Sequence, residues 1–168
     1  MLFAWHRTLV HGRGDLRDIG HYRTGNEPME VVSGAIHDPR VHFEAPPSSD
    51  VPGEMARFAA WFSRTASGGS ESLPALTRAG IAHLYFVSIH PFEDGNGRIG
   101  RAIAEKALAQ SLGQPTLTPL AATILARRTA YYDALEVANK NTKSRLGWLG
   151  LQGQQSKLSG ALARRSNS

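Results

Sequence analysis

One segment near the middle of the chain is apolar on nearly every face of a helix. Residues 74–89, PALTRAGIAHLYFVSI, begin with a proline, which suits the first turn of a helix. A helix that is apolar all round is buried on all sides. We therefore expect it to be the core helix around which the other elements pack. It leads into a glycine-containing loop at 90–97, and a second helix at about 98–112 ends at Gly113.

The remaining segments predict further helices and one hairpin. Helical spacing of apolar side chains indicates helices at about 3–11, 53–65 and 119–139. The last of these is interrupted near Arg127. Residues 29–44 carry two β-branched runs around a turn at 37–39, which is typical of a β-hairpin. The predicted fold class is mostly α, a helical core with one small β-hairpin.

Length and composition limit the class of protein. The chain has 168 residues, enough for one domain with a core and too few for two ordinary domains. It has no cysteine, which excludes disulfides and thiolate metal sites and fits a reducing compartment. No apolar run is long enough for a membrane span, and the first residues do not resemble a signal peptide. We therefore expect a cytoplasmic protein without a membrane partner.

The net charge of +5 is unevenly distributed along the chain. Residues 1–139 carry 13 Lys and Arg against 14 Asp and Glu, whereas residues 140–168 carry six Lys and Arg and no acid. The basic excess therefore lies in the tail 140–168, whose low complexity predicts disorder. A nucleic-acid-binding protein would instead carry a basic face with interleaved aromatic residues on its folded body. The charge pattern argues against nucleic acid as a partner.

The loop between the two central helices carries the densest chemistry. Residues 90–101 read HPFEDGNGRIGR. The Gly-Asn-Gly at 95–97 can adopt left-handed backbone angles at little cost, and the start of the following helix offers unpaired N–H groups to an anion. Arg98 and Arg101 share one face of that helix. Two guanidinium groups beside such a loop suit a polyphosphate.

Two ionisable residues of the same loop suggest a reaction. Asp94 would be repelled by a phosphate unless a divalent cation lay between them, and Mg²⁺ commonly binds through one carboxylate plus substrate phosphates. His90, at the end of the preceding helix, has an ordinary pKa near ~6.5, which suits a general base for a hydroxyl. Phe92 between them fits a core plug that fixes the loop. Each feature alone has a structural explanation, but together they indicate a metal-assisted, phosphate-binding enzyme site.

The same twelve residues carry a family resemblance. HPFEDGNGRIGR matches the Fic signature H-x-F-x-[DE]-G-N-G-R-x-x-R at every specified position. The chain from 20 to 139 resembles a Fic catalytic core, preceded by an N-terminal helix and loop at 1–19 and followed by the basic tail 140–168. The resemblance implies a mostly α Fic fold with a small β-hairpin flap. It also implies transfer of AMP from ATP, with Mg²⁺, to a Tyr, Thr or Ser hydroxyl of a target protein.

The resemblance also gives roles to individual residues. His90 is the general base for the target hydroxyl, and Asp94 holds the Mg²⁺. The remaining motif residues bind phosphate: Gly95, Asn96 and Gly97 cradle the transferred group, Arg98 holds an outer phosphate, and Arg101 holds the terminal one.

Two further sites follow from the resemblance by position. Family members use a Tyr and an Asn eight residues apart to contact the nucleoside, and Tyr131 with Asn139 has this spacing. Packing of Tyr131 in the core is an equally good interpretation. The flap that pairs with an extended target segment corresponds to residues 31–43, with Ser33 and Gly34 nearest the site.

Regulation and the transferred group stay open at this stage. Many Fic proteins carry an inhibitory helix, [ST]-x-x-x-E-[GN], whose glutamate pairs with the second arginine of the motif. Ser67 to Glu71 has the spacing, but Ser72 follows and the segment reads as a loop. In the related subgroup that helix lies upstream of Met1, and the chain starts like the middle of a larger protein. Transfer of UMP, phosphate or phosphocholine, removal of AMP, and an inactive module are the alternatives.

Overall fold

The computed structural model describes residues 1–25, 29–35, 38–115 and six positions between 126 and 137. Two compact units can be distinguished, Met1–Arg127 and Arg128–Ser168. The tail 140–168, Asn139 and most of the predicted helix 119–139 lie outside the described residues, so what was expected of them stays a prediction. No helix in the described ranges is both long and apolar enough to cross a membrane.

The first unit holds seven named elements and is mostly helical, as predicted. In chain order these are α1 (Leu2–Leu9), β1 (Glu30–Ala35), β2 (Asp38–Glu44), the short 3-10 helix η1 (Ser48–Asp50), α2 (Val51–Arg64), α3 (Ala75–Ile89) and α4 (Asn96–Leu112). The helix after the glycine-containing loop begins at Asn96, two residues before its predicted start. It ends, as predicted, at Gly113, which adopts a left-handed conformation.

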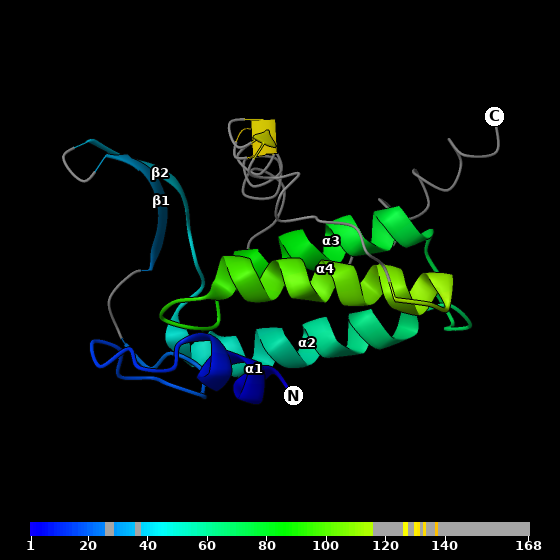
Figure 1. The fold of residues 1–168 in the computed structure, drawn as a ribbon, viewed down its shortest axis with the longest axis horizontal. Helices are drawn as coiled ribbons and strands as arrows, with labels where there is room; N and C mark the ends of the chain where they lie inside the picture. The colour runs from blue at the N-terminus through cyan, green and yellow to red at the C-terminus, as the bar shows by residue number, and fades with distance from the viewer. Residues whose placement is uncertain are drawn as a thin grey trace. The chain divides into compact units, whose positions relative to one another are not determined.

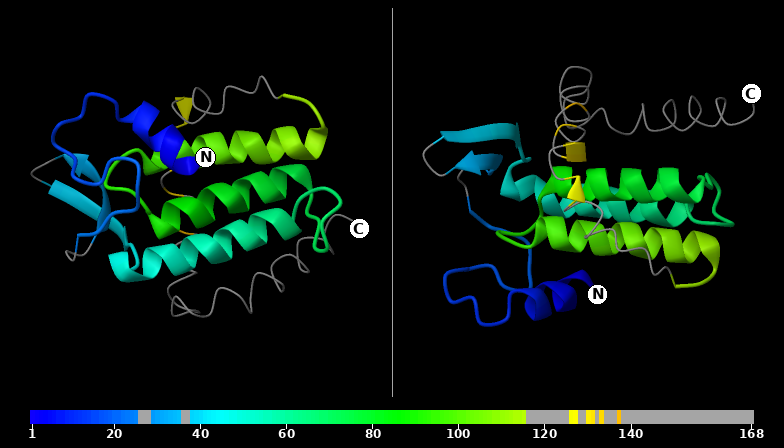
Figure 2. Two further views of the ribbon diagram at one scale, coloured as in Figure 1. Left: turned by 90° about the horizontal axis from the view of Figure 1, so that it is seen from below. Right: turned by 45° about the horizontal axis from the view of Figure 1, so that its top comes forward.

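α3 is the core helix, which confirms the interpretation of its apolar pattern. It packs against both α2 and α4, and the left view of Figure 2 shows it between these two helices, which are labelled in Figure 1. Ala82 and Phe86 of α3 are 0% exposed. The ring of Phe58 on α2 packs edge-on against Tyr85 of α3, with ring centroids 5.3 Å apart. Full burial of a side chain such as Phe86 stabilises the fold by about 1.5–3 kcal/mol.

α4 can approach α3 closely because Gly100 has no side chain. A Cβ at Gly100 would lie 2.9 Å from Val87 Cγ1 and 3.0 Å from His83 Nδ1, both on α3. Any larger residue would push the two helices apart. The close contact brings the first turn of α4 next to the last turn of α3, which is where the motif loop lies.

A buried arginine joins the three long helices at the other end of α3. Arg78 is 0% exposed and donates to Phe62 O at 2.8 Å and Ala107 O at 3.2 Å. Its guanidinium carbon lies 4.2 Å from the centroid of the Phe62 ring. The acceptors belong to the C-terminal parts of α2 and α4, where the helix dipoles favour a cation.

β1 and β2 pair antiparallel, with Ala35 opposite Asp38 and Gly34 opposite Pro39. The predicted turn at 37–39 is therefore wrong in part, because Asp38 and Pro39 lie in β2. A proline fits there because each strand of a two-stranded sheet is an edge, where a residue without an N–H can be tolerated. The function of this pair of strands as a flap stays a prediction.

Candidate active site

The loop between α3 and α4 begins and ends with a residue in the left-handed backbone conformation. Among the described residues His90, with φ of 50°, is the single non-glycine with positive φ. Such a conformation costs about 1–2 kcal/mol and is found preferentially at functional sites. Gly95 has φ of 84°, and a Cβ there would lie 2.8 Å from Leu9 Cδ2. Asn96 and Gly97, which the sequence also allowed to be left-handed, are instead the first residues of α4.

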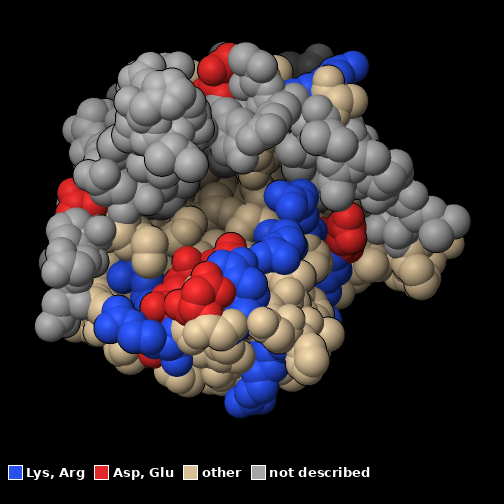
Figure 3. Space-filling model, turned by 60° about the vertical axis from the view of Figure 1, so that its left-hand side comes forward, with Lys and Arg blue, Asp and Glu red and all other residues tan. Residues whose placement is uncertain are grey.

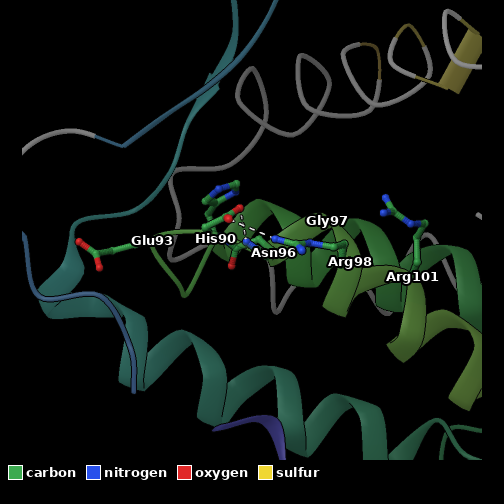
Figure 4. Close-up of a pocket in the computed structure, with 8 residues that line it drawn as sticks. His90, Glu93, Asn96, Gly97, Arg98 and Arg101 are labelled. Carbon is green, nitrogen blue, oxygen red and sulfur yellow. Dashed lines mark hydrogen bonds and ion pairs between the residues drawn. The ribbon is translucent and has the colours of Figure 1, made fainter. Parts of the chain in front are cut away.

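A pocket of about 250 Å³ lies over this loop and the first two turns of α4 (Figure 4). Its lining residues are His90, Glu93, Asp94, Gly95, Asn96, Gly97, Arg98 and Arg101. The structure thus brings together all the motif residues to which the resemblance gives a role. It adds Glu93, which has no predicted role.

His90 is held as a neutral imidazole with a defined tautomer. Its Nδ1 lies 3.2 Å from Val87 O. A carbonyl oxygen only accepts, so Nδ1 carries the proton and Nε2 keeps its lone pair. Burial of the ring lowers the pKa of His90 to about 4. The side chain therefore has a free basic nitrogen at neutral pH, as a general base requires.

The carboxylate of Asp94 lies between two guanidinium groups. Its Oδ2 accepts from Arg98 Nη2 at 3.1 Å and from Arg13 Nη1 at 2.9 Å, while Oδ1 accepts from the backbone N–H of Gly95. Arg13 was missed from the sequence. It lies 81 positions from Asp94 in the chain. No local spacing links the two residues.

The metal-ligating side chains of the pocket suit a cation that takes most of its ligands from a substrate. In the described part of the chain, no group of three or more His, Cys, Asp or Glu could hold a metal. Asp94, with a side chain 36% exposed, is the one predicted ligand. Mg²⁺ is commonly bound by one or two carboxylates completed by phosphates and water. A lone carboxylate beside an anion-binding loop fits this type of site.

The two motif arginines are held differently. Arg98 reaches back to the loop and forms an ion pair with Asp94 (Figure 4). Within the described residues, no acidic side chain lies at ion-pair distance from Arg101. A Cβ at Gly97 would lie 3.5 Å from Arg101 Nη1, so this guanidinium lies alongside the first turn of α4. Arg101 therefore has no ion pair with a described residue to break before it receives an anion.

Asn96 does not extend its side chain toward a ligand. It is 2% exposed, its Oδ1 accepts from Phe92 N at 3.0 Å, and its Nδ2 donates to Phe92 O at 2.7 Å. Both polar atoms are thus used to fix the loop. The predicted contact of Asn96 with the transferred phosphate stays a prediction, and with the side chain in this position it would be made by the backbone N–H.

α1 fixes the loop through a buried histidine, His6, whose role no pattern in the sequence indicates. The ring of His6 stacks on Phe92, with centroids 4.1 Å apart and planes 8° apart. Its Nε2 donates to Asp94 O at 3.2 Å, and its Nδ1 accepts from Gly20 N at 3.0 Å. Burial lowers the pKa of His6 and so favours the neutral ring that makes both bonds. Phe92 is 0% exposed, which confirms its predicted role as a core plug.

The segment that follows α1 adds further bonds to the loop. Buried Arg23 donates from Nε to His90 O at 2.7 Å and from its backbone N to Pro91 O at 3.0 Å. The carboxylate of Glu93 accepts the N–H groups of Arg17 and Asp18, each at 2.7 Å. Acidic and basic side chains are intermixed on this face of the molecule (Figure 3). Residues 1–25 are therefore part of the framework of the site.

The structure does not test the other four predicted site residues. Ser33 and Gly34 lie in β1, opposite Arg40 and Pro39. Tyr131 is helical and belongs to the second unit, and Asn139 lies outside the described residues. Their predicted contacts with nucleotide and target stay predictions.

Comparison with known proteins identifies the family. The Fic/DOC family model matches residues 1–108. Protein adenylyltransferase Fic of Drosophila virilis is 35% identical over 128 residues, which span 74% of this chain and 23% of that protein. The protein of the same name from Drosophila mojavensis is 36% identical over 93 residues, 53% of this chain and 17% of that protein. The chain belongs to the Fic/DOC family.

Solved structures agree with this assignment. A Fic family protein from Desulfovibrio desulfuricans G20 superposes with a TM-score of 0.68 and 31% identity, over 83% of this chain and 39% of that one. A Fic domain-containing signaling protein from Bacteroides thetaiotaomicron VPI-5482 has a TM-score of 0.53 at 22% identity and supports the fold alone. The chain spans less than a quarter of the length of the curated relatives described above.

Proposed function

We propose that this chain is a protein adenylyltransferase, which transfers AMP from ATP to a Tyr, Thr or Ser hydroxyl of a target protein. The observation that carries the proposal is the neutral His90, whose Nε2 has a free lone pair in the same pocket as the α4 N-terminus and two arginines. The target oxygen attacks the α-phosphorus while its proton passes to Nε2. The bond from that phosphorus to the bridging oxygen breaks, and pyrophosphate leaves.

The remaining pocket residues bind and orient the nucleotide in this proposal. Asp94 would hold Mg²⁺, which would neutralise charge on the phosphates and on the leaving pyrophosphate. The backbone N–H groups of Gly95, Asn96 and Gly97 cradle the transferred phosphate at the positive end of the helix dipole. Arg98 exchanges its exposed pair with Asp94 for a phosphate, and Arg101 takes the terminal one. Positioning and charge neutralisation then supply most of the rate enhancement.

The target protein and the nucleoside have proposed sites as well. An extended target segment pairs with the open edge of the hairpin at 31–43, near Ser33 and Gly34, and main-chain hydrogen bonds hold it there. Tyr131 and Asn139 contact the nucleoside. This part of the proposal rests on the family and on spacing.

The proposal is tested by following two labels. The chain is incubated with Mg²⁺, a cell lysate and either α-labelled or γ-labelled ATP, and labelled protein bands are measured. Relative to the same lysate without the chain, AMP transfer adds bands labelled from α-labelled ATP alone, whereas added bands from γ-labelled ATP would mean phosphate transfer. UMP or phosphocholine transfer would add no band in either lane, and labelled UTP or CDP-choline then identifies the donor.

Two variants test the assigned roles. His90→Ala should lower transfer by about 10²–10⁴-fold, the usual contribution of a positioned general base, and leave nucleotide affinity nearly intact. Asp94→Ala should weaken binding of the Mg²⁺ complex of ATP, and EDTA should do the same to the parent chain. An Asp94→Ala variant that transfers normally, together with indifference to EDTA, would show that the cation assignment is wrong.

A further inference from the structure

Arg13 contacts the site from outside the sequence motif. It lies on the loop after α1 and uses three of its N–H groups at once. Nε and Nη2 donate to the two carboxylate oxygens of Asp15 at 2.7 and 2.6 Å, and Nη1 donates to Asp94 Oδ2 at 2.9 Å. A guanidinium with a bidentate partner has a fixed orientation. Arg13 therefore presents Nη1 to Asp94 in one direction.

The second guanidinium at Asp94 is held much less firmly. Arg98 makes one contact with this carboxylate, at 3.1 Å. The two arginine side chains are about equally exposed, 46% for Arg98 and 45% for Arg13, so the difference between them is the fork from Arg13 to Asp15. An exposed single pair of this kind contributes little to stability, so a phosphate in the pocket can readily displace Asp94 as the partner of Arg98. Arg13 keeps its fork to Asp15 in that event. It is thus the partner that stays on Asp94.

The backbone that carries Arg13 is itself tied to the motif loop. The N–H of Arg13 donates to Val10 O at 3.0 Å, at the end of α1. A few residues later, the N–H groups of Arg17 and Asp18 donate to Glu93, next to Asp94. Arg13 therefore reaches the carboxylate from a stretch of chain fixed on both sides.

The charge of Arg13 is already balanced. Asp15 forms an ion pair with it at 2.6 Å, and this pairing lowers the pKa of Asp15 to about 2, so that Asp15 is ionised at neutral pH. The Arg13–Asp15 pair has no net charge. It can donate a hydrogen bond to Asp94 without repelling a cation bound on the other side of the same carboxylate.

We propose that Arg13, held by Asp15, is a positioning residue that orients the Asp94 carboxylate for the nucleotide-bound divalent cation. The inference rests on the cation site of the proposed function. When Arg98 moves to a phosphate, Oδ2 of Asp94 keeps one hydrogen bond, from Arg13, and has a lone pair left for the cation. A carboxylate already fixed by a partner behind it binds a metal more tightly than a freely rotating one.

The test measures Mn²⁺ binding directly, by calorimetry or by the loss of the free Mn²⁺ resonance, in the presence of a non-hydrolysable ATP analogue. Arg13→Ala should weaken Mn²⁺ binding by about 10–100-fold, the usual effect of losing an outer partner of a metal ligand. Arg17→Ala is the matched control. It removes the same charge from the same loop, but the Arg17 side chain is 79% exposed and lies 3.7 Å from Glu93. The Mn²⁺ affinity of Arg17→Ala should stay within about twofold of that of the parent chain.

A second variant and a second readout separate this role from a structural one. Asp15→Asn keeps the size of the side chain but weakens the fork, and should weaken Mn²⁺ binding by several-fold. Affinity for the ATP analogue in EDTA should be unchanged in Arg13→Ala and Asp15→Asn, because neither residue is assigned a phosphate. Melting curves check that both variants are folded.

Three results would overturn the inference. Tighter Mn²⁺ binding by Arg13→Ala would mean that Arg13 competes with the cation. Equal behaviour of Arg13→Ala and Arg17→Ala would mean that the ion pair is an ordinary surface contact. Normal Mn²⁺ binding by Asp94→Ala would remove the cation site and the inference with it. If Asp94→Ala loses Mn²⁺ binding while Arg13→Ala keeps it, the inference about Arg13 is wrong and the proposed cation site at Asp94 stands.

Discussion

Two loops at opposite ends of α3 look alike in sequence and are held in different ways. Residues 65–74 and 90–95 both contain glycine and link long helices. In the first, the backbone bonds are local, such as Glu71 N to Arg64 O at 2.9 Å and Gly69 N to Ala66 O at 2.8 Å. In the second, the bonds come from distant segments, with His6 lying 88 positions from Asp94 and Arg23 lying 67 positions from His90.

The difference shows how a glycine-containing loop becomes suitable for chemistry. A reacting group must be held near its productive geometry, because a displacement of about 1 Å can cost 10²-fold in rate. Local turn bonds cannot supply that rigidity alone, whereas buried bonds from α1 and from Arg23 hold the loop from outside. We therefore expect the loop at 90–95 to be intolerant of changes to its framework and the loop at 65–74 to be tolerant.

The largest effect should come from removing the aromatic plug. Phe92→Ala deletes a ring that is 0% exposed and packs on His6 and Phe86. The free energy of unfolding should fall by about 3–5 kcal/mol, as in other buried Phe→Ala changes. Leu73→Ala, at the half-buried end of the other loop, is the control and should cost clearly less. Urea titration measures both, and equal losses would contradict the contrast between the loops.

A smaller loss should follow from removing the side chain that bridges the loop. Asn96→Ala leaves both the N–H and the C=O of Phe92 without their partner, in a buried position. An unsatisfied buried group costs about 1–3 kcal/mol. Asn96→Asp keeps the acceptor and loses the donor, so its loss should be intermediate. If both variants melt like the parent, water replaces Asn96 and the loop does not depend on it.

The sequence predicts much of this framework but not its long-range bonds. The apolar pattern of α3 and the glycine after α4 predict the helices, and the spacing of the motif predicts which residues share a pocket. His6, Arg13 and Arg23 were missed because nothing in their local sequence says which distant carbonyl or carboxylate they meet. The bonds of Asn96 to Phe92 could not be predicted either, because a motif residue that fixes a loop and one that binds a phosphate look the same in sequence.

Lowering the pH should destabilise the loop at 90–95 by less than the substitutions of Phe92 and Asn96, and should not affect the loop at 65–74 through a histidine. Burial lowers the pKa of His90 to about 4 and also lowers that of His6. The unfolded state, with a histidine pKa near ~6.5, binds more protons as the pH falls below that value. The contribution of each neutral histidine to the free energy of unfolding is therefore present above pH ~6.5 and is lost as the pH falls toward the pKa of the folded state.

For His90 alone, the loss between pH 7 and pH 5.5 is about 1.2 kcal/mol. Urea titrations at the two pH values measure it, and His90→Gln should show a correspondingly flatter dependence. The loop at 65–74 contains no histidine. A parent chain as stable at pH 5.5 as at pH 7 would show that these rings are not held neutral by burial.

The smallest effect should come from Glu71, although Ser67 to Glu71 has the spacing of an inhibitory Fic segment. Glu71 forms an ion pair with Arg64 at 3.0 Å and its side chain is 57% exposed. It follows the C-terminus of α2, at the end of α3 remote from the pocket (Figure 1). The 15 residues of α3 separate the two ends by roughly 22 Å.

Glu71→Ala should therefore change stability by less than about 0.5 kcal/mol, because an exposed pair contributes little. It should leave AMP transfer unchanged, since Glu71 cannot reach Arg101 within one chain. Auto-modification assays at several protein concentrations measure this, with Glu71→Gln alongside. A tenfold gain in transfer that grows with concentration would mean that Glu71 blocks the pocket of a second copy, and the loop at 65–74 would then be as functional as the one at 90–95.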